Sequence, residues 1–78
     1  MRRNNLDIYS DILNVSEYGA LKTQIVYKAN LNFNIVKKHI DALMKRGFVE
    51  KDDRFYFTTE RGKNFVESYR QLKSMTAA

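Results

Sequence analysis

The sequence predicts an α+β domain, mainly α, with a three-helix core, a two-stranded β-hairpin and an extended C-terminal helix. Three observations support this fold. Apolar residues recur at helical spacing in four segments, glycines follow two of these segments, and two aromatic or β-branched runs lie between the third and the fourth. The 78 residues have room for a single domain over 1–78, within which 60–76 forms the final helix.

The first two predicted helices lie on either side of Gly19. The first runs from about Asn5 to Val15, and Asn4 or Asn5 can cap it. The second is shorter and ends near Lys28. The apolar side chains at helical spacing are Leu6, Tyr9, Ile12 and Leu13 in the first helix, and Leu21, Ile25, Val26 and Ala29 in the second.

A tight polar corner, Asn30-Leu31-Asn32, leads into a third helix over about Phe33 to Arg46. We expect Leu31 to point inward and Asn32 to accept a hydrogen bond from the first turn of the third helix. Gly47 is expected to end this helix, because glycine adopts the left-handed conformation at little cost. Two helices joined by a short corner are a common way to hold one helix in the major groove of DNA.

The third helix separates into two sides at about 100° per residue. The predicted core stripe consists of Val36, Ile40 and Leu43, with Phe33 and Met44 at its edge. The opposite side is polar and basic, and it carries Asn34, Lys38, Asp41 and Lys45, flanked by Lys37 and by Ile35 and Ala42. We expect Ile35 and His39 to serve in packing, and the alternative for Ile35 is contact with a thymine methyl group.

Two short strands are predicted after Gly47, over about Phe48 to Lys51 and Phe55 to Thr58. Asp52, Asp53 and Arg54 form the tip that joins them. A hairpin placed directly after a helix of this kind is the wing of a winged-helix domain. Its tip is mixed in charge, so the two acidic residues oppose the attraction that Lys51 and Arg54 would exert on DNA.

The final helix is predicted from about Glu60 through Leu72, with Thr58 or Thr59 as its cap. Phe65 and Val66 are expected to close the core over the first helix. Tyr69, Leu72 and Met75 extend the same stripe, and we expect them to be exposed in a monomer. The hypothesis is a homodimer in which this helix forms a short coiled coil with its mate. The alternative is that the weakly patterned end of the helix frays.

The charge of the chain is concentrated in the two-helix segment. Residues 18–49 carry six basic side chains and one acidic side chain. The net charge of this segment is therefore +5, which equals the net charge of the whole chain. A polyanion would require such a location, although a solvated lysine-rich surface is the simpler alternative. Lys22, Thr23 and Gln24 also begin a helix, where free N–H groups favour phosphate.

Several side chains are therefore candidates for DNA contact. Asn34 has the side chain for reading an adenine edge, while Lys37 and Lys38 would bind phosphates. Lys51 and Arg54 would reach the backbone or the minor groove from the wing. The full set of predicted DNA-binding residues is Lys22, Thr23, Gln24, Lys28, Asn32, Asn34, Lys37, Lys38, Lys51 and Arg54.

Other functions have little support in the sequence. There is no cysteine and only one histidine, so we expect no disulfide, no metal site and no cofactor. No glycine-rich phosphate loop, His–carboxylate pair or activated nucleophile is recognisable, so we do not expect an enzyme, and no small-molecule ligand is evident. The chain lacks an apolar run long enough to span a bilayer and a signal peptide at its start, which leads us to expect a cytoplasmic protein without a membrane partner.

Three segments carry a resemblance to a known family: TQIVYKANL (Thr23 to Leu31), Leu43 to Gly47 before Phe48-Val49, and the turn from Thr58 to Lys63. With the order of the elements, they resemble the small winged helix-turn-helix proteins of archaea, a family of predicted transcriptional regulators that includes dimeric chromatin-associated proteins. The resemblance implies a winged-helix fold, DNA as the partner, and dimerisation through an extended C-terminal helix. Ile35 departs from it, because a polar residue is more usual there, and the short sequence after Leu72 would shorten a coiled coil.

Our expectation is a transcriptional regulator at the nucleoid. It would bind duplex DNA as a homodimer, with the third helix in the major groove and the wing on the flanking backbone or minor groove. One alternative is a low-specificity architectural chromatin protein. Another is an adaptor for other proteins, which would use the aromatic wing residues Phe55, Tyr56 and Phe57 if they were exposed.

Overall fold

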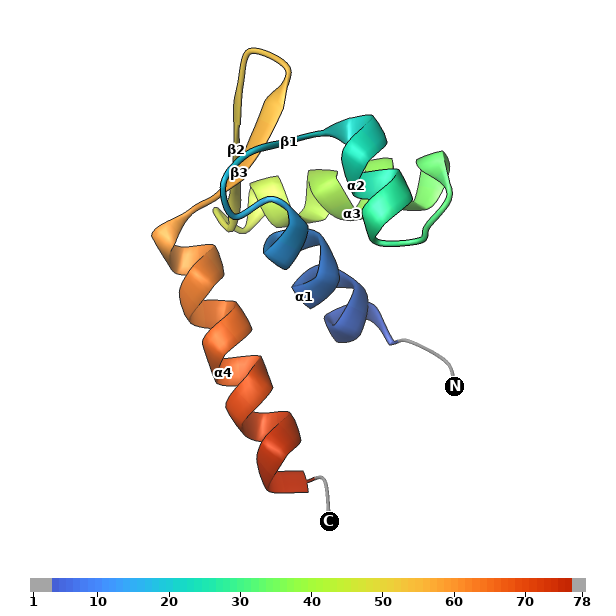
Figure 1. Cartoon of the computed structure of the whole chain (residues 1–78). Coiled ribbons are helices and arrows are strands. Elements are labelled where there is room, and N and C mark those ends of the chain that lie inside the picture. Colours follow the sequence, from blue (N-terminus) through green and yellow to red (C-terminus); the bar gives the residue numbers. More distant parts are fainter. Residues whose placement is uncertain (1–3, 77–78) are drawn as a thin grey trace.

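Four helices and a small sheet make up residues 4–76, the part of the chain that the computed structural model describes. The order is α1 (Asn5–Val15), β1 (Ala20–Leu21), α2 (Lys22–Lys28), α3 (Phe33–Lys45), β2 (Val49–Asp52), β3 (Phe55–Thr58) and α4 (Glu60–Thr76). Helices α1, α2 and α3 pack together, the β2–β3 hairpin projects from them, and α4 runs beside α1 (Figure 1). The predicted mainly helical winged-helix architecture is confirmed.

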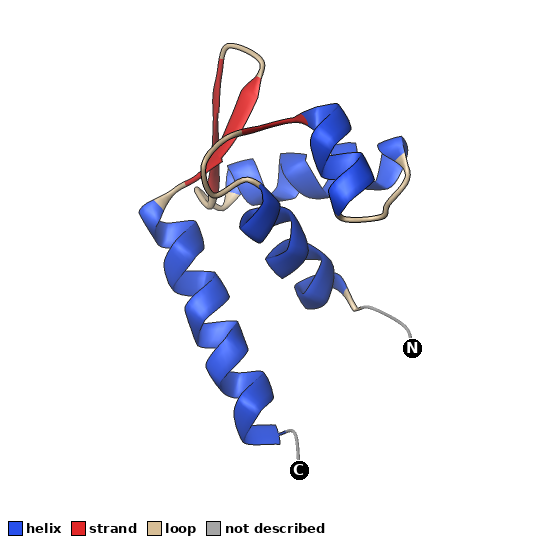
Figure 2. Ribbon diagram, in the orientation of Figure 1, coloured by secondary structure: helices blue, strands red, loops and turns tan. Residues whose placement is uncertain are grey.

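The sheet has three antiparallel strands in the order β1-β3-β2 (Figure 2). The pairing of β2 with β3 forms the predicted wing, in which Val49 lies opposite Thr58. Strand β1 adds a third strand through the pairs Ala20↔Tyr56 and Leu21↔Phe55. The prediction of two strands was incomplete, because a strand of two residues shows no alternation in sequence and forms only where β3 supplies its hydrogen-bond partners.

The core lies where α1, α2 and α3 meet the base of the wing. The predicted stripe of α3 is confirmed, since Val36, Ile40 and Leu43 are all buried. They pack with the buried apolar residues of the other elements, which are Ile12, Leu13, Ala20, Ile25, Val49 and Tyr56. Leu31 packs against this cluster from the corner, as expected. The burial of these side chains fixes α3 on the domain by one side only and leaves its opposite side to solvent.

Capping side chains begin three of the helices. The Asn4 carboxamide accepts a hydrogen bond from the Asp7 N–H (2.8 Å) at α1, and the Asn32 carboxamide accepts one from the Ile35 N–H (2.8 Å) at α3. At α4 the Thr59 hydroxyl accepts from the Gly62 N–H (3.1 Å). These contacts confirm the expected caps and satisfy N–H groups that have no partner within the helix.

Gly62 lies at the closest approach between α4 and the loop before the wing. A Cβ at this position would be 2.3 Å from the backbone oxygen of Phe48 and 2.8 Å from the Cγ2 atom of Thr58. Because one of these contacts is with backbone, a side-chain rotation cannot relieve it. The absence of a side chain at Gly62 therefore sets how closely α4 packs on the base of the wing.

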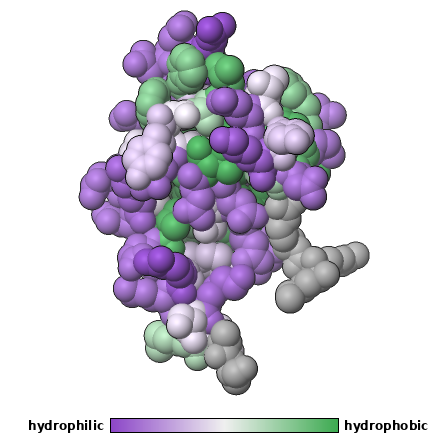
Figure 3. Space-filling model, in the orientation of Figure 1, coloured by the Kyte–Doolittle hydropathy of each residue, from purple (hydrophilic) through white to green (hydrophobic). Residues whose placement is uncertain are grey.

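The surface of the domain is mainly hydrophilic. Figure 3 shows polar residues over most of one face, with most of the hydrophobic residues in its upper half and a smaller hydrophobic group at its lower end. Among the helices of residues 4–76, none combines the length and the apolar character needed to traverse a bilayer.

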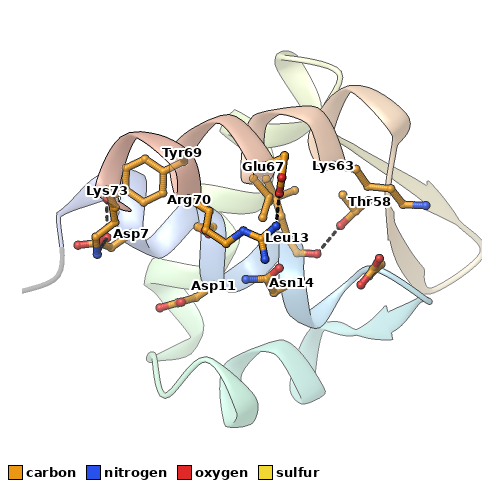
Figure 4. A pocket seen from close by; sticks show the side chains of 13 residues that line it. Asp7, Asp11, Leu13, Asn14, Thr58, Lys63, Glu67, Tyr69, Arg70 and Lys73 are labelled. Atoms are coloured by element: carbon orange, nitrogen blue, oxygen red, sulfur yellow. Dashed lines mark hydrogen bonds and ion pairs between the residues drawn. The ribbon is translucent and has the colours of Figure 1, made fainter. Parts of the chain in front are cut away.

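Helix α4 lies antiparallel to α1, and a polar groove of about 490 Å³ runs between them (Figure 4). At one end of the groove the Tyr69 hydroxyl donates to the Asp7 carboxylate, and the Lys73 ammonium lies 3.0 Å from the same carboxylate. At the other end the Thr58 hydroxyl donates to the Leu13 carbonyl (2.7 Å). The expectation that Tyr69 would be exposed was therefore wrong, because its hydroxyl is held by Asp7 and its ring stacks on Phe65.

The Asp7 cluster, consisting of Asp7, Tyr69 and Lys73, shifts the ionisation of its members. The hydrogen bond from Tyr69, and then that from Lys73, lower the pKa of the Asp7 carboxyl. The same bonds to Asp7 raise the pKa of the Tyr69 phenol and of the Lys73 ammonium. All three shifts favour the charged carboxylate and its two donors, so the cluster holds the C-terminal part of α4 against the start of α1.

Candidate nucleic-acid interface

The outer side of α3 is the first part of the candidate interface. Six polar residues and Ala42 line a shallow groove that follows the helix: Asn34, Lys37, Lys38, Asp41, Ala42, Lys45 and Arg46. All but Ala42 are exposed. They project together because the core stripe occupies the opposite side of the same helix. We call this the α3 surface.

A second concave region lies between the wing and the first turns of α2 and α3. Its lining residues come from five elements and from the turn between β2 and β3: Leu21, Lys22, Thr23, Phe33, Lys51, Arg54 and Tyr56. The pairing of β1 with β3 brings Leu21 and Lys22 beside the wing, while Lys51 lies opposite Tyr56 in the hairpin. We call this region the wing cleft, and its volume is about 340 Å³.

The lysine and arginine side chains of these two regions have no acidic partner among residues 4–76. The ion pairs resolved within residues 4–76 join Lys73 to Asp7 and Arg70 to Glu67, both outside the α3 surface and the wing cleft. The cations of the cleft lie over aromatic rings instead. Lys22 is 5.3 Å from the centre of the Phe33 ring, and Lys51 is 5.7 Å from that of Tyr56. The positive charge is therefore available to an external anion.

The two-residue turn at the wing tip gives Arg54 its position in the wing cleft. Strand β2 ends at Asp52 and β3 begins at Phe55, so the turn consists of Asp53 and Arg54 alone. Asp53 has a φ of 57°, a left-handed conformation that aspartate tolerates better than most residues. Asp53 is thus used in the turn, while Asp52 ends β2 and the Arg54 guanidinium lies over the Phe55 ring.

The structure brings together seven of the ten side chains that the sequence suggested for DNA contact. Asn34, Lys37 and Lys38 lie on the α3 surface, and Lys22, Thr23, Lys51 and Arg54 lie in the wing cleft. The other three, Gln24, Lys28 and Asn32, line neither region. Gln24 accepts a hydrogen bond from the Leu21 N–H (2.8 Å) and Asn32 caps α3, so both already have a structural role.

Some residues of the two regions were not among the predicted DNA contacts. Lys45 and Arg46 extend the α3 surface. The spacing of about 100° per residue already places Lys45 opposite the core stripe, which was a reason to count Lys45 among the DNA contacts. Phe33 was assigned to the edge of the core, yet half of its surface is exposed in the wing cleft. The local sequence does not show whether Phe33 lies at the edge of the core or in the wing cleft, because the cleft is formed by β1 and the wing, which are distant in the sequence.

Two packing expectations for α3 had different outcomes. His39 is buried, with 7% of its surface exposed, and it meets the Tyr9 ring edge-on at 5.4 Å between ring centres. Burial, and then the nearby Lys38 charge, lower the pKa of the His39 imidazole. Ile35, in contrast, is 36% exposed, so the expectation that it would be packed was wrong.

The aromatic run of the wing is mostly covered. Tyr56 belongs to the core, and Phe57 is half-buried, with its ring lying over Gly19. Only Phe55 remains exposed, and the Arg54 guanidinium lies over its ring. No three His, Asp or Glu side chains within the described part of the chain are arranged to hold a metal ion.

Comparison with known proteins gives three findings. A family model described as winged helix-turn-helix matches residues 2–77. The uncharacterized protein MJ0287 of Methanocaldococcus jannaschii is 33% identical over 72 residues, which cover 91% of this chain and 74% of that protein. The crystal structure of Sso10a-2, a DNA-binding protein from Sulfolobus solfataricus, superposes with a TM-score of 0.86 at 28% identity, covering 95% of this chain and 82% of Sso10a-2.

Proposed function

This chain belongs to the winged helix-turn-helix family, and on that premise we propose that it binds double-stranded DNA through the α3 surface and the wing. The observation that carries the proposal is the grouping of lysine and arginine side chains without acidic partners on these two regions. The DNA-binding protein Sso10a-2, which has the same fold, supports it.

In the proposed complex, α3 enters the major groove. A helix with its side chains is about 10–12 Å wide, which matches the width of about 12 Å of the major groove of B-DNA. Lys37, Lys38 and Lys45 would bind phosphates on either side, and Asn34 would face the base edges. The Asp41 carboxylate would repel the DNA phosphates, so we expect it to face the middle of the major groove and not either sugar-phosphate backbone.

The wing would contact the flanking backbone or the adjacent minor groove. Lys51 and Arg54 project from the hairpin beside Lys22, and together they present three cations to one strand. This arrangement adds phosphate contacts to those of α3 without adding sequence information. The wing therefore contributes affinity, and α3 contributes any specificity.

We further propose that the protein is a transcriptional regulator at the nucleoid, rather than a protein that coats DNA without regard to sequence. Asn34 supports this choice, because it is an exposed amide in the first turn of α3, where base edges are read. An adaptor function is less well supported, since only one of the three aromatic wing residues is exposed.

A homodimer through α4 completes the proposal. Leu72 is 55% exposed and Met75 is 83% exposed, so the last turns of α4 present apolar side chains that the monomer does not cover. Tyr69 is bound to Asp7, which limits the dimer contact to positions beyond it. Sedimentation at tens of micromolar should give a dimer for the natural chain and a monomer for Leu72→Glu combined with Met75→Glu. A monomeric natural chain would exclude this part of the proposal.

The DNA function is tested by equilibrium titration of duplexes at low and moderate salt. A selected pool of duplexes should bind more tightly than a random pool if the protein is a regulator, by a factor that Asn34→Ala reduces. Equal affinity for both pools would support the architectural alternative. The absence of binding to either pool at low salt would exclude both DNA functions.

A further inference from the structure

The wing cleft has apolar and aromatic lining residues, which contact with a DNA backbone does not explain. These are Leu21, Phe33 and Tyr56, and they lie beside the cationic lining residues Lys22, Lys51 and Arg54. Phosphates need cations and hydrogen-bond donors, and the three cationic side chains supply these. Phosphates do not bind to an aromatic surface, so the cleft has the chemistry for a ligand that combines negative charge with an apolar, flat group.

Phe33 is the side chain that makes the cleft unusual. It is the first residue of α3, and half of its surface is exposed. The nearby exposed residues Asn34 and Lys37 are polar, so Phe33 is an aromatic side chain within a polar surface. The Lys22 ammonium lies over the ring, 5.3 Å from its centre. Aromatic rings bordered by cations are the usual means by which proteins bind unpaired nucleotides, because bases stack on the rings and phosphates meet the cations.

We propose that the wing cleft binds one unpaired base of a single-stranded DNA segment that adjoins a duplex. The base stacks on Phe33, and the phosphates on either side of it contact Lys22, Lys51 and Arg54. This inference rests on the proposed function, since it treats the cleft as a continuation of the duplex-binding surface. The protein would then prefer a duplex with a single-stranded extension to a blunt duplex.

An unpaired base suits the cleft better than a paired one does. Inside a duplex each base is stacked on its neighbours, and only its edges are accessible in the grooves. The face of a base becomes available to a protein ring only when the base has left the stack. The volume of about 340 Å³ lies at the lower end of the range for small-ligand sites, which matches a single planar group and not a longer peptide.

The experiment compares three labelled DNAs at one salt concentration: a blunt duplex, the same duplex with a short single-stranded extension, and the extension strand alone. The natural chain should bind the extended duplex about tenfold more tightly than the blunt duplex, which is the size of effect expected from stacking one base. 2-Aminopurine placed in the extension should lose fluorescence on binding, because stacking on a ring quenches it.

Variants at position 33 separate stacking from general apolar contact. Phe33→Tyr keeps an aromatic ring and should retain the preference for the extended duplex, whereas Phe33→Leu keeps an apolar side chain and should lose the preference and the quenching. Ile35→Ala is the matched control, since Ile35 is another exposed apolar residue of the first turn of α3 and lines neither region. Circular dichroism would verify that each variant is folded.

The outcomes distinguish this inference from the proposed function. Equal affinity of the natural chain for blunt and extended duplexes would overturn the inference and leave duplex binding intact. A preference that survives in Phe33→Leu would also overturn it, because charge alone would then account for the effect. Binding to the extended duplex and the single strand, but not to the blunt duplex, would overturn duplex binding and with it the inference, because the cleft would then not continue a duplex-binding surface. No binding to any of the three would overturn both.

Discussion

On the side formed by α1 and α4, Lys73 and Arg70 are paired with carboxylates, whereas the cations of the α3 surface and the wing cleft have no acidic partner within residues 4–76. The pair between Lys73 and Asp7 joins elements that lie far apart in the sequence, whereas the pair between Arg70 and Glu67 lies within α4. The unpaired charges lie on a surface held in place by an apolar core. The same residue type thus positions a helix on one side of the domain and is free to meet a polyanion on the other.

The comparison extends to packing. On the α4 side, Gly62 allows backbone to lie against backbone, and the Thr58 hydroxyl is bonded to the Leu13 carbonyl. On the α3 side, the residues of the α3 surface other than Ala42 are exposed, and Phe33 is half-exposed in the wing cleft. Substitutions that disturb these contacts of α4 should therefore change stability, and substitutions of the cations of the α3 surface should change binding.

The largest effect on stability should come from Gly62→Ala. The new Cβ would clash with the Phe48 carbonyl, and an overpacked site of this kind typically costs about 1–3 kcal/mol or more. Urea unfolding measures the loss, with Ser68→Ala, at an exposed position of α4, as a control that should stay within about 0.5 kcal/mol of the natural chain. Equal stability of Gly62→Ala and the natural chain would show that α4 does not pack closely against the Phe48 backbone.

A smaller effect is expected from Asp7→Asn, which removes the charge that Tyr69 and Lys73 bind. The melting temperature should fall at neutral pH, and the loss should be smaller when Lys73→Ala is already present, since a double-mutant cycle isolates the pair. Duplex affinity should not change. An equal loss in both backgrounds would show that Asp7 and Lys73 are not coupled.

The Asp7 effect has a defined pH dependence. The Asp7 pKa is lowered from its ordinary value of 3.8 in the folded chain, so the unfolded carboxyl takes up a proton first as the pH falls. The advantage of the natural chain over Asp7→Asn should be complete above about pH 3.8 and should disappear as the pH falls through the lowered folded pKa. Thermal unfolding at a series of acidic pH values measures this difference.

The smallest effect should come from His39, which lies between the two sides, on α3 but against Tyr9 of α1. Its folded pKa is lowered from 6.5, so the unfolded chain binds the proton more readily and stability should decrease as the pH falls below that value. His39→Phe keeps a ring against Tyr9 and should flatten this decrease between neutral pH and about pH 5. A decrease of the same size in His39→Phe would assign it to other groups.

Most of the helical framework could be predicted from the sequence, because it depends on local signals. The helical spacing of Val36, Ile40 and Leu43, the cap at Asn32 and the left-handed Gly47 all act within one or two turns. The residues on the outer side of α3 could be predicted from the same helical spacing. The predicted start of α4 at Glu60 was also confirmed, and the helix ends at Thr76, the end of the predicted segment 60–76.

The features that the sequence did not predict depend on contacts between distant segments. Strand β1 exists only because β3 lies beside it, and the Asp7 cluster joins residues 62 and 66 positions apart in the chain. The partial exposure of Phe33 in the wing cleft likewise depends on the wing. Periodicity gives the direction of a side chain around its own helix, and it cannot show which other element will cover that side chain.

The central claim, that unpaired cations on one side of the domain bind DNA, is tested most directly by two lysines that differ in position. Lys38→Ala and Lys63→Ala remove the same charge from exposed side chains, the first from the α3 surface and the second from the groove beside α4. The slope of log affinity against log salt for a duplex should decrease in magnitude by about 0.9 for Lys38→Ala and remain unchanged for Lys63→Ala. Equal slopes for the two variants would contradict the account, because the net charge of the chain, and not the α3 surface, would then govern binding.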